Sequence, residues 1–187
     1  MERVQWFDTP ERYGLISRTL HWGMALLFTW QFAGMVVRMA VGRAPITAFM
    51  VGSHRPIGTL LLVLALLRLA WALLNLRRRP LYAAGGTGFL ARVGHTALYA
   101  LMVAVPAIGL LRQYASGRSF AMWGIEVFAA RPDRIDWLHA LLNPLHGPAA
   151  WTLLALVAGH VLMALVHRWV WRDEVLPRMA GRVRRPA

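Results

Sequence analysis

Three histidines lie on one long apolar stretch, residues 145–168, at spacings of fourteen and seven residues. Both spacings return an α-helix to nearly the same face, so His146, His160 and His167 form one stripe. The first two stand roughly 21 Å apart along the helix axis at about 1.5 Å per residue. Imidazole is costly in hydrocarbon, and it can ligate a metal or transfer a proton. The stripe therefore predicts a functional surface.

The composition is that of an integral membrane protein. Hydrophobic residues make up 58% of the 187 positions, only 16% are charged, and the mean hydropathy is +0.46. This is too apolar for an ordinary soluble domain. The net charge of +13 comes from 21 basic residues, all arginine. They cluster beside apolar runs, which indicates membrane topology and anionic lipid rather than nucleic acid.

The chain contains no cysteine. Disulfides, thiolate-bound iron–sulfur clusters, covalent CxxCH haem and thiol redox catalysis are therefore excluded. Any redox chemistry needs a cofactor that is bound non-covalently.

Four apolar runs predict four membrane-spanning helices in a single domain over residues 1–187. The first run is longer than the apolar part of a signal peptide, so it is expected to be retained as a span. The predicted fold class is an all-α, up-down-up-down four-helix bundle. The spans are expected at about 17–39, 54–76, 89–111 and 145–168.

The connections between the spans predict where several helices begin. Residues 41–53 are expected to form a short loop that ends in Ser53, a good N-cap, so that His54 opens the second span. Pro106 lies inside the third span and predicts a kink there.

The longest polar segment, 112–144, precedes the fourth span. Within it, residues 132–142 (PDRIDWLHALL) predict a short amphipathic helix at the membrane interface. Asn143 and Pro144 are expected to be the N-cap and first residue of the fourth helix, with His146 in its first turn.

The distribution of arginine predicts the orientation in the membrane. Thirteen arginines fall in the two terminal segments and the connection at 77–92, and seven fall in the other two connections with their flanks. The richer side should be cytoplasmic, so both termini are expected inside. His54 and His146 then lie near the outer face, and His21 and His160 lie toward the inner face.

These depths predict two histidine pairs, here named the outer pair (His54 and His146) and the inner pair (His21 and His160). Helical bundles build cofactor sites from facing side chains, and neutral imidazole is a common axial ligand of haem iron. Two bis-histidine haems would use all four residues. A zinc site would need clustered ligands, whereas fourteen residues of helix separate His146 from His160.

The remaining histidines leave alternatives open. His95 is either a helix-end residue, a quinone contact or the partner of a haem propionate. His139 is expected on a solvated face. His167, beside Arg168, is either a proton donor near a quinone or part of the interfacial belt of polar and aromatic residues.

Arg68 lies in the middle of the second span. An arginine there is too costly to face lipid, so it should point into the bundle or extend toward the inner surface. Its expected partner is a haem propionate or a backbone carbonyl.

Several motifs together carry a family resemblance. They are LHW at 20–22, SHRPIG at 53–58, LARVGHTALYALMVAVPAIG at 90–109, and H-x13-H-x6-HR followed by WRDEVLPRM at 171–179. Over about residues 13–179 the chain resembles the bacterial cytochrome b561 family, which consists of four-helix, di-haem membrane cytochromes.

The resemblance implies an oxidoreductase similar to superoxide oxidase, placed in the bacterial inner membrane. Such a protein takes electrons from superoxide at the outer face and passes them through two b haems to ubiquinone. Both histidine pairs match the family's haem ligands. His167 matches a family histidine near the quinone, and Arg168 replaces the second histidine usually found there, so the two residues are the implied quinone site.

The partners expected from these observations are lipid, a quinone, and either superoxide or a redox protein. An anionic donor would be drawn by outer arginines. The candidates are Arg43, Arg55, Arg112 and Arg118. One alternative is a haem-bearing membrane anchor of a larger dehydrogenase or hydrogenase. Another is a small transporter or scaffold whose histidines bind nothing.

Overall fold

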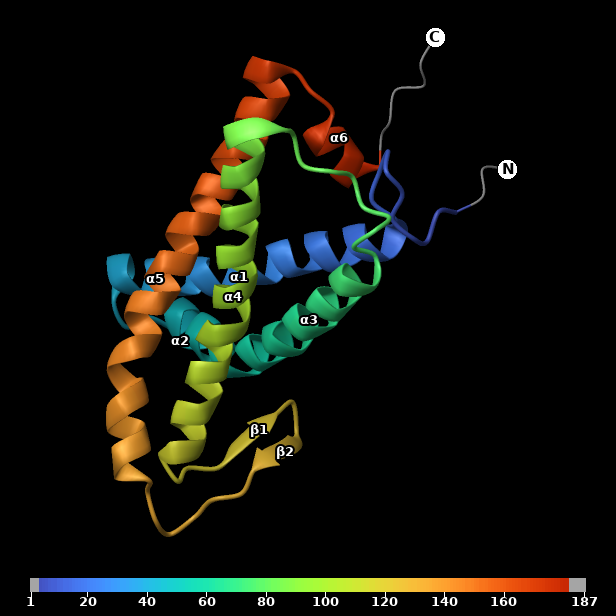
Figure 1. The fold of residues 1–187 in the computed structure, drawn as a ribbon. Coiled ribbons are helices and arrows are strands. Elements are labelled where there is room, and N and C mark those ends of the chain that lie inside the picture. The colour runs from blue at the N-terminus through green and yellow to red at the C-terminus, as the bar shows by residue number, and fades with distance from the viewer. Residues whose placement is uncertain (1–3, 182–187) are drawn as a thin grey trace.

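A computed structural model describes residues 4–181, and four long helices dominate it (Figure 1). Four stretches are long and apolar enough to cross a membrane, which confirms the predicted all-α membrane fold. The long helices are α1 (Leu15–Val41), α3 (His54–Leu74), α4 (Gly85–Ala115) and α5 (Asp136–Val166). The shorter elements are α2 (Pro45–Gly52), β1 (Phe120–Met122), β2 (Ile125–Phe128), the π-helical turn η1 (His167–Trp171) and α6 (Val175–Ala180).

The long helices pack on one another in chain order. Helix α1 packs on α3, α3 packs on α4, and α4 packs along α5; Figure 1 shows α4 (green) and α5 (orange) side by side. Side chains from all four helices meet in one buried cluster. Its members are Met24, Phe28, Leu61, Ala65, Leu98, Met102, Val105 and Leu153. Many other apolar side chains, such as Leu26 and Leu74, are exposed, as expected for helices that face lipid.

The connection between the first two spans is helical rather than the expected loop. Pro45 occupies the first turn of α2, where its missing N–H costs no helical hydrogen bond. The Thr47 hydroxyl accepts a hydrogen bond from the Ala44 amide at 2.9 Å and donates to the Ala44 carbonyl at 2.8 Å. These local bonds start a helix, so only Ser53 separates α2 from α3.

Helix α5 begins earlier than predicted, so most of the expected interfacial helix at residues 132–142 forms its first turns. It starts at Asp136 and continues through Pro144 and Pro148. Asn143 lies inside α5 and therefore caps no helix; its side-chain oxygen accepts a hydrogen bond from Arg112 at 3.4 Å. Membrane helices tolerate internal proline when neighbouring groups compensate for the lost backbone bond. His146 therefore lies in the third turn of α5, not in its first.

A two-stranded antiparallel hairpin, β1 and β2, occupies the connection between α4 and α5 and was not predicted. Its two turn residues, Trp123 and Gly124, both have positive φ, 48° and 89°. Such turns match the twist of paired strands and usually carry Asn-Gly or Asp-Gly. Because tryptophan occupies the first position, the sequence lacks the Asn-Gly or Asp-Gly pair from which such a turn is normally predicted.

Both ends of the described chain meet at one end of the bundle (Figure 1). The buried carboxylate of Asp8 pairs with Arg79 in the α3–α4 connection at 3.0 Å and accepts the Gly14 amide at 2.8 Å. The Trp22 indole of α1 donates to the Met179 carbonyl of α6 at 3.2 Å. An even number of spans returns the chain to the side from which it started.

Candidate functional site

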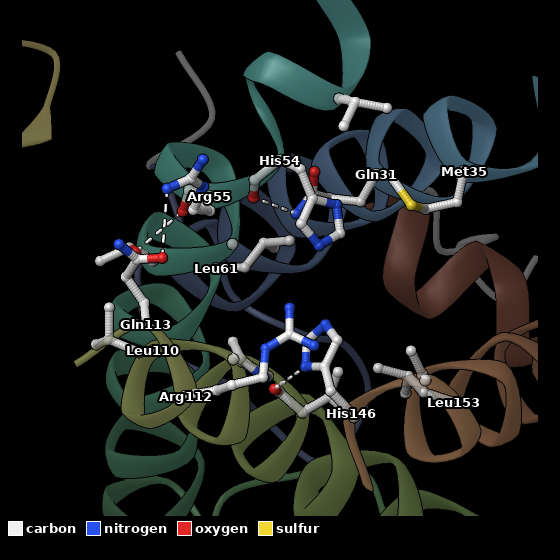
Figure 2. Close-up of a pocket in the computed structure, with 18 of the residues that line it drawn as sticks. Gln31, Met35, His54, Arg55, Leu61, Leu110, Arg112, Gln113, His146 and Leu153 are labelled. Atoms are coloured by element: carbon white, nitrogen blue, oxygen red, sulfur yellow. Dashed lines mark hydrogen bonds between the residues drawn. The ribbon is translucent and has the colours of Figure 1, made fainter. Parts of the chain in front are cut away.

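The outer pair comes together across the bundle. The imidazole rings of His54 and His146 have centroids 6.1 Å apart and an interplanar angle of 81°. The Nδ1 atom of His146 donates to the Val105 carbonyl of α4 at 3.1 Å, and no described residue forms a hydrogen bond with its Nε2. Figure 2 shows both rings in the same pocket, one from α3 and one from α5.

The inner pair has nearly the same geometry. The rings of His21 and His160 have centroids 6.2 Å apart and an interplanar angle of 77°. The Nδ1 atoms of His21 and His54 are buried and have no hydrogen-bond partner among the described residues.

A cavity of about 680 Å³ adjoins the outer pair. Four arginines line it, and none of the described residues that line it is acidic. They are Arg38, Arg55, Arg112 and Arg118, three of which the sequence had suggested; Arg43 is exposed and is not part of the lining. The cavity therefore offers a strongly cationic environment.

Two buried amide side chains line this cavity and were missed in the sequence. Gln31 of α1 donates from Nε2 to the His54 carbonyl at 2.9 Å, while its buried Oε1 has no partner among the described residues. Gln113 of α4 accepts a hydrogen bond from Arg55 at 3.3 Å, as Figure 2 shows. A glutamine in a membrane span is costly, and that cost is the signal that could have identified Gln31.

Gly109 leaves the space that His146 occupies. A Cβ atom on Gly109 would lie 2.9 Å from Cε1 and 3.2 Å from Nδ1 of the imidazole. Any larger residue on this face of α4 would push the ring out of its place. The glycine and the Val105 carbonyl, one helical turn apart, together set the position of His146.

Arg68 and His95 both lie close to the inner pair. The Arg68 guanidinium of α3 sits over the Tyr99 ring of α4, 5.5 Å from its centroid, so it faces the bundle. The His95 ring lies 5.3 Å from that of His160, and its Nδ1 is 3.1 Å from the Tyr82 hydroxyl. His95 is therefore more than a helix-end residue, and Tyr82 is a contact that the sequence did not reveal.

His167 begins η1 and has a partner that the sequence analysis missed. Its Nδ1 donates to a carboxylate oxygen of Asp173 at 2.5 Å, and its ring meets that of Trp171 edge-on at 4.5 Å. Arg168, the next residue, is exposed. The six-residue separation of His167 from Asp173 fits no regular helical spacing, so no periodicity could have revealed the pair.

His139 lies at the solvent-accessible mouth of the outer cavity, so its face is solvated as expected. It is one of the lining residues, and its Nδ1 is 2.9 Å from the Arg134 guanidinium. The extension of α5 back to Asp136 brings it there.

Comparison with known proteins decides the family. The family described as prokaryotic cytochrome b561 matches residues 12–182, nearly the whole chain. This chain belongs to the prokaryotic cytochrome b561 family. It is therefore a multi-pass membrane cytochrome with an electron-transfer or oxidoreductase role, and membership implies a b-type haem.

Individual cytochrome b561 relatives are similar over almost their full length. The chain is 32% identical to cytochrome b561 homolog 2 of Escherichia coli K12, covering 94% of each chain. It is 29% identical to a probable superoxide oxidase, CybB, of Yersinia pestis, covering 93% of this chain and 98% of that protein.

The two histidine pairs of this cytochrome b561 fit axial ligation of haem iron. Two metal–imidazole bonds of about 2 Å each, plus about 1 Å from each bonding nitrogen to its ring centre, would put two rings that hold one metal about 6 Å apart. The observed separations are 6.1 Å and 6.2 Å. The arginines of the outer cavity and Arg68 near the inner pair suit the carboxylates of haem propionates.

Proposed function

We propose that this protein carries electrons across the bilayer from superoxide at the outer face to ubiquinone at the inner face. In this proposal His54 and His146 hold one b-type haem, and His21 and His160 hold a second. The observation that carries the proposal is the pair of facing imidazoles at each of two levels, with nearly equal separations. The haems, when bound, supply one-electron chemistry, and the protein supplies position and insulation.

The cationic cavity supports an anionic outer donor. Its four arginines, without a described acidic neighbour in the lining, raise the local concentration of a small anion beside His54 and His146. Superoxide is such an anion, and one similar protein is named a probable superoxide oxidase. The donor proposal rests on this charge and this relative together.

The quinone proposal rests on the far end of α5. His167 lies seven residues beyond His160, roughly 10 Å along the helix, and Arg168 follows it. Reduction of a quinone consumes protons as well as electrons, so a protonatable side chain near the inner pair is needed. Arg68, which faces the bundle beside Tyr99, would balance the carboxylates of the inner haem.

We further propose that the whole chain forms one domain in a bacterial inner membrane, with both termini in the cytoplasm. The excess of arginine on the side of the termini supports this orientation. Labelling of single cysteines introduced near Ser116 and Arg77 with a membrane-impermeant reagent tests it. Modification in intact cells is expected at position 116 and not at position 77.

The purified, partner-free protein tests the function. A reduced-minus-oxidised spectrum with haem quantification should give two b haems per chain, and superoxide should then drive reduction of ubiquinone. Haem without superoxide-driven activity, together with a co-purifying partner, would indicate the membrane subunit of a larger dehydrogenase or hydrogenase. A colourless protein would contradict both functions.

A further inference from the structure

The turn after α5 folds a carboxylate back onto His167. Arg172 adopts the left-handed conformation (φ 53°), which reverses the chain directly after η1. The Asp173 amide then donates to the His167 carbonyl at 3.1 Å. The Asp173 carboxylate thereby reaches the imidazole, which donates from Nδ1 to Oδ2 at 2.5 Å. The π-helical turn builds a side-chain pair that an uninterrupted α-helix would not form.

Both partners of this pair are fixed. The second carboxylate oxygen of Asp173 accepts the Val175 amide at 3.1 Å, at the start of α6. The edge of the Trp171 ring meets the imidazole at 4.5 Å with an interplanar angle of 88°. The orientation of His167 is thus set by a charged hydrogen bond on one side and by an aromatic contact on another.

The free nitrogen of His167 remains available. Nδ1 is occupied by Asp173, and no described residue forms a hydrogen bond with Nε2. The His167 side chain is 25% exposed, which is enough for a ligand at the surface of the bundle to reach it. With Nδ1 held by the carboxylate, Nε2 is the ring nitrogen that can exchange a proton with a bound ligand.

We infer that Asp173 is a positioning residue that holds His167 with Nε2 directed at the quinone, so that His167 donates a proton during quinone reduction. This inference rests on the proposed function, in which ubiquinone accepts the electrons. The quinone takes up two electrons, one at a time, from the reduced protein, and two protons. His167 supplies one proton: its Nε2–H bond breaks as an O–H bond forms on the quinone. The imidazole stays bonded to Asp173 and regains a proton from water, which also supplies the second proton.

The variant Asp173→Asn tests the charge without removing the turn. Asparagine keeps an oxygen for the Val175 amide but loses the negative charge of the carboxylate that orients the imidazole. The purified, haem-loaded protein is reduced with dithionite, mixed with ubiquinone-1, and followed by haem absorbance. We expect the maximal reoxidation rate to fall about tenfold, a typical effect of removing such an outer partner, while the KM for ubiquinone-1 stays within about twofold.

A second variant separates positioning from a general structural effect. His167→Gln should lower the maximal rate at least as far, and Asp173→Asn in the His167→Gln background should lower it no further, because Asp173 acts through His167. The matched control is Asp136→Asn, which makes the same chemical change in the exposed pair with Arg134 and should leave the rate unchanged.

The possible outcomes are distinct. A wild-type reoxidation rate in Asp173→Asn would overturn the inference. A double variant about tenfold slower than His167→Gln would overturn it as well. Both results leave the proposed function intact. If ubiquinone-1 does not reoxidise the reduced wild-type protein at all, the quinone proposal fails, and the inference fails with it.

Discussion

The imidazole of His146 is oriented by its surroundings before any cofactor binds. The Val105 carbonyl accepts its Nδ1–H, and Gly109 leaves room for its Cε1 edge. A hydrogen bond to the other ring nitrogen is the usual way in which proteins fix the tautomer and direction of a ligating histidine. At the scale of single residues, the contacts with Val105 and Gly109 therefore hold the His146 ring in one orientation.

Replacement of single histidines should resolve the two sites. His146→Ala and His160→Ala are each expected to remove one of the two proposed haems, because each deletes one axial ligand. The measurement is haem per chain, together with the reduced-minus-oxidised spectrum. His139→Ala, on the same helix, should retain both haems. If His54→Ala kept both haems, the assignment of the outer pair would be wrong. If His95→Ala lost a haem and His21→Ala did not, the assignment of the inner pair would be wrong, because the His95 ring lies 5.3 Å from that of His160.

Gly109→Ala should weaken the outer site alone. The new Cβ atom would stand 2.9 Å from the His146 ring, and relief of such an overlap costs about 1–3 kcal/mol. We expect one haem to be bound about tenfold or more weakly, measured as haem loss on dilution in detergent. Gly159→Ala is the control, since a Cβ atom there meets nothing within 4 Å. Equal haem retention in the two variants would contradict the proposed crowding.

At the scale of elements, one buried ion pair joins segments that are far apart in the sequence. Asp8, with a fully buried side chain, pairs with Arg79, so the segment before α1 is fastened to the α3–α4 connection. Asp8 also accepts the Gly14 amide immediately before α1 begins. The entry of α1 into the bundle, and hence the level of His21, depends on this contact.

Arg79→Ala should destabilise the protein by about 3–5 kcal/mol, because it leaves the buried Asp8 carboxylate unpaired. Thermal unfolding of the purified protein would measure the loss. Arg77→Ala, at an exposed position two residues earlier, should change the midpoint little. The combined Asp8→Asn and Arg79→Ala variant should be more stable than Arg79→Ala alone. If the combined variant were less stable than Arg79→Ala, the unpaired charge of Asp8 would not be the cause of the destabilisation.

At the scale of the whole molecule, charge is distributed so that the outer cavity is cationic. Arg38, Arg55, Arg112 and Arg118 come from three different segments of the chain and meet only in the folded protein. Their combined field acts on any anion that approaches the outer pair, and such steering weakens as salt screens it.

The proposed superoxide-driven reduction of ubiquinone should therefore slow as ionic strength rises. Arg118→Gln should lower kcat/KM for superoxide severalfold at low salt and flatten the salt dependence. Arg43→Gln removes the same charge outside the cavity lining, so its effect should be smaller. If the two substitutions lowered kcat/KM equally, the steering would come from the net charge of the protein rather than from the arginines of the cavity.

The sequence by itself determined the properties that depend on local composition. Runs of apolar residues about twenty long must span a membrane, so the four spans followed from length and hydropathy. Four histidines could be assigned a depth in the membrane, because each span has a direction and a fixed rise per residue. They are His21, His54, His146 and His160. The absence of cysteine limited the cofactor chemistry.

Only the tertiary structure decided which side chains meet. The paired histidine rings come together because of how the helices rotate about their axes and pack. The same packing places the His146 ring beside Gly109, and the turn after η1 brings Asp173 to His167. Hydropathy along the sequence does not encode rotation, packing or turns. The start of α5 at Asp136 was not predicted either, since Asn143 and Pro144 form a local pattern typical of a helix start although the helix continues through them. A local pattern fixes the depth of a residue in the membrane, whereas contacts between distant segments fix its partner.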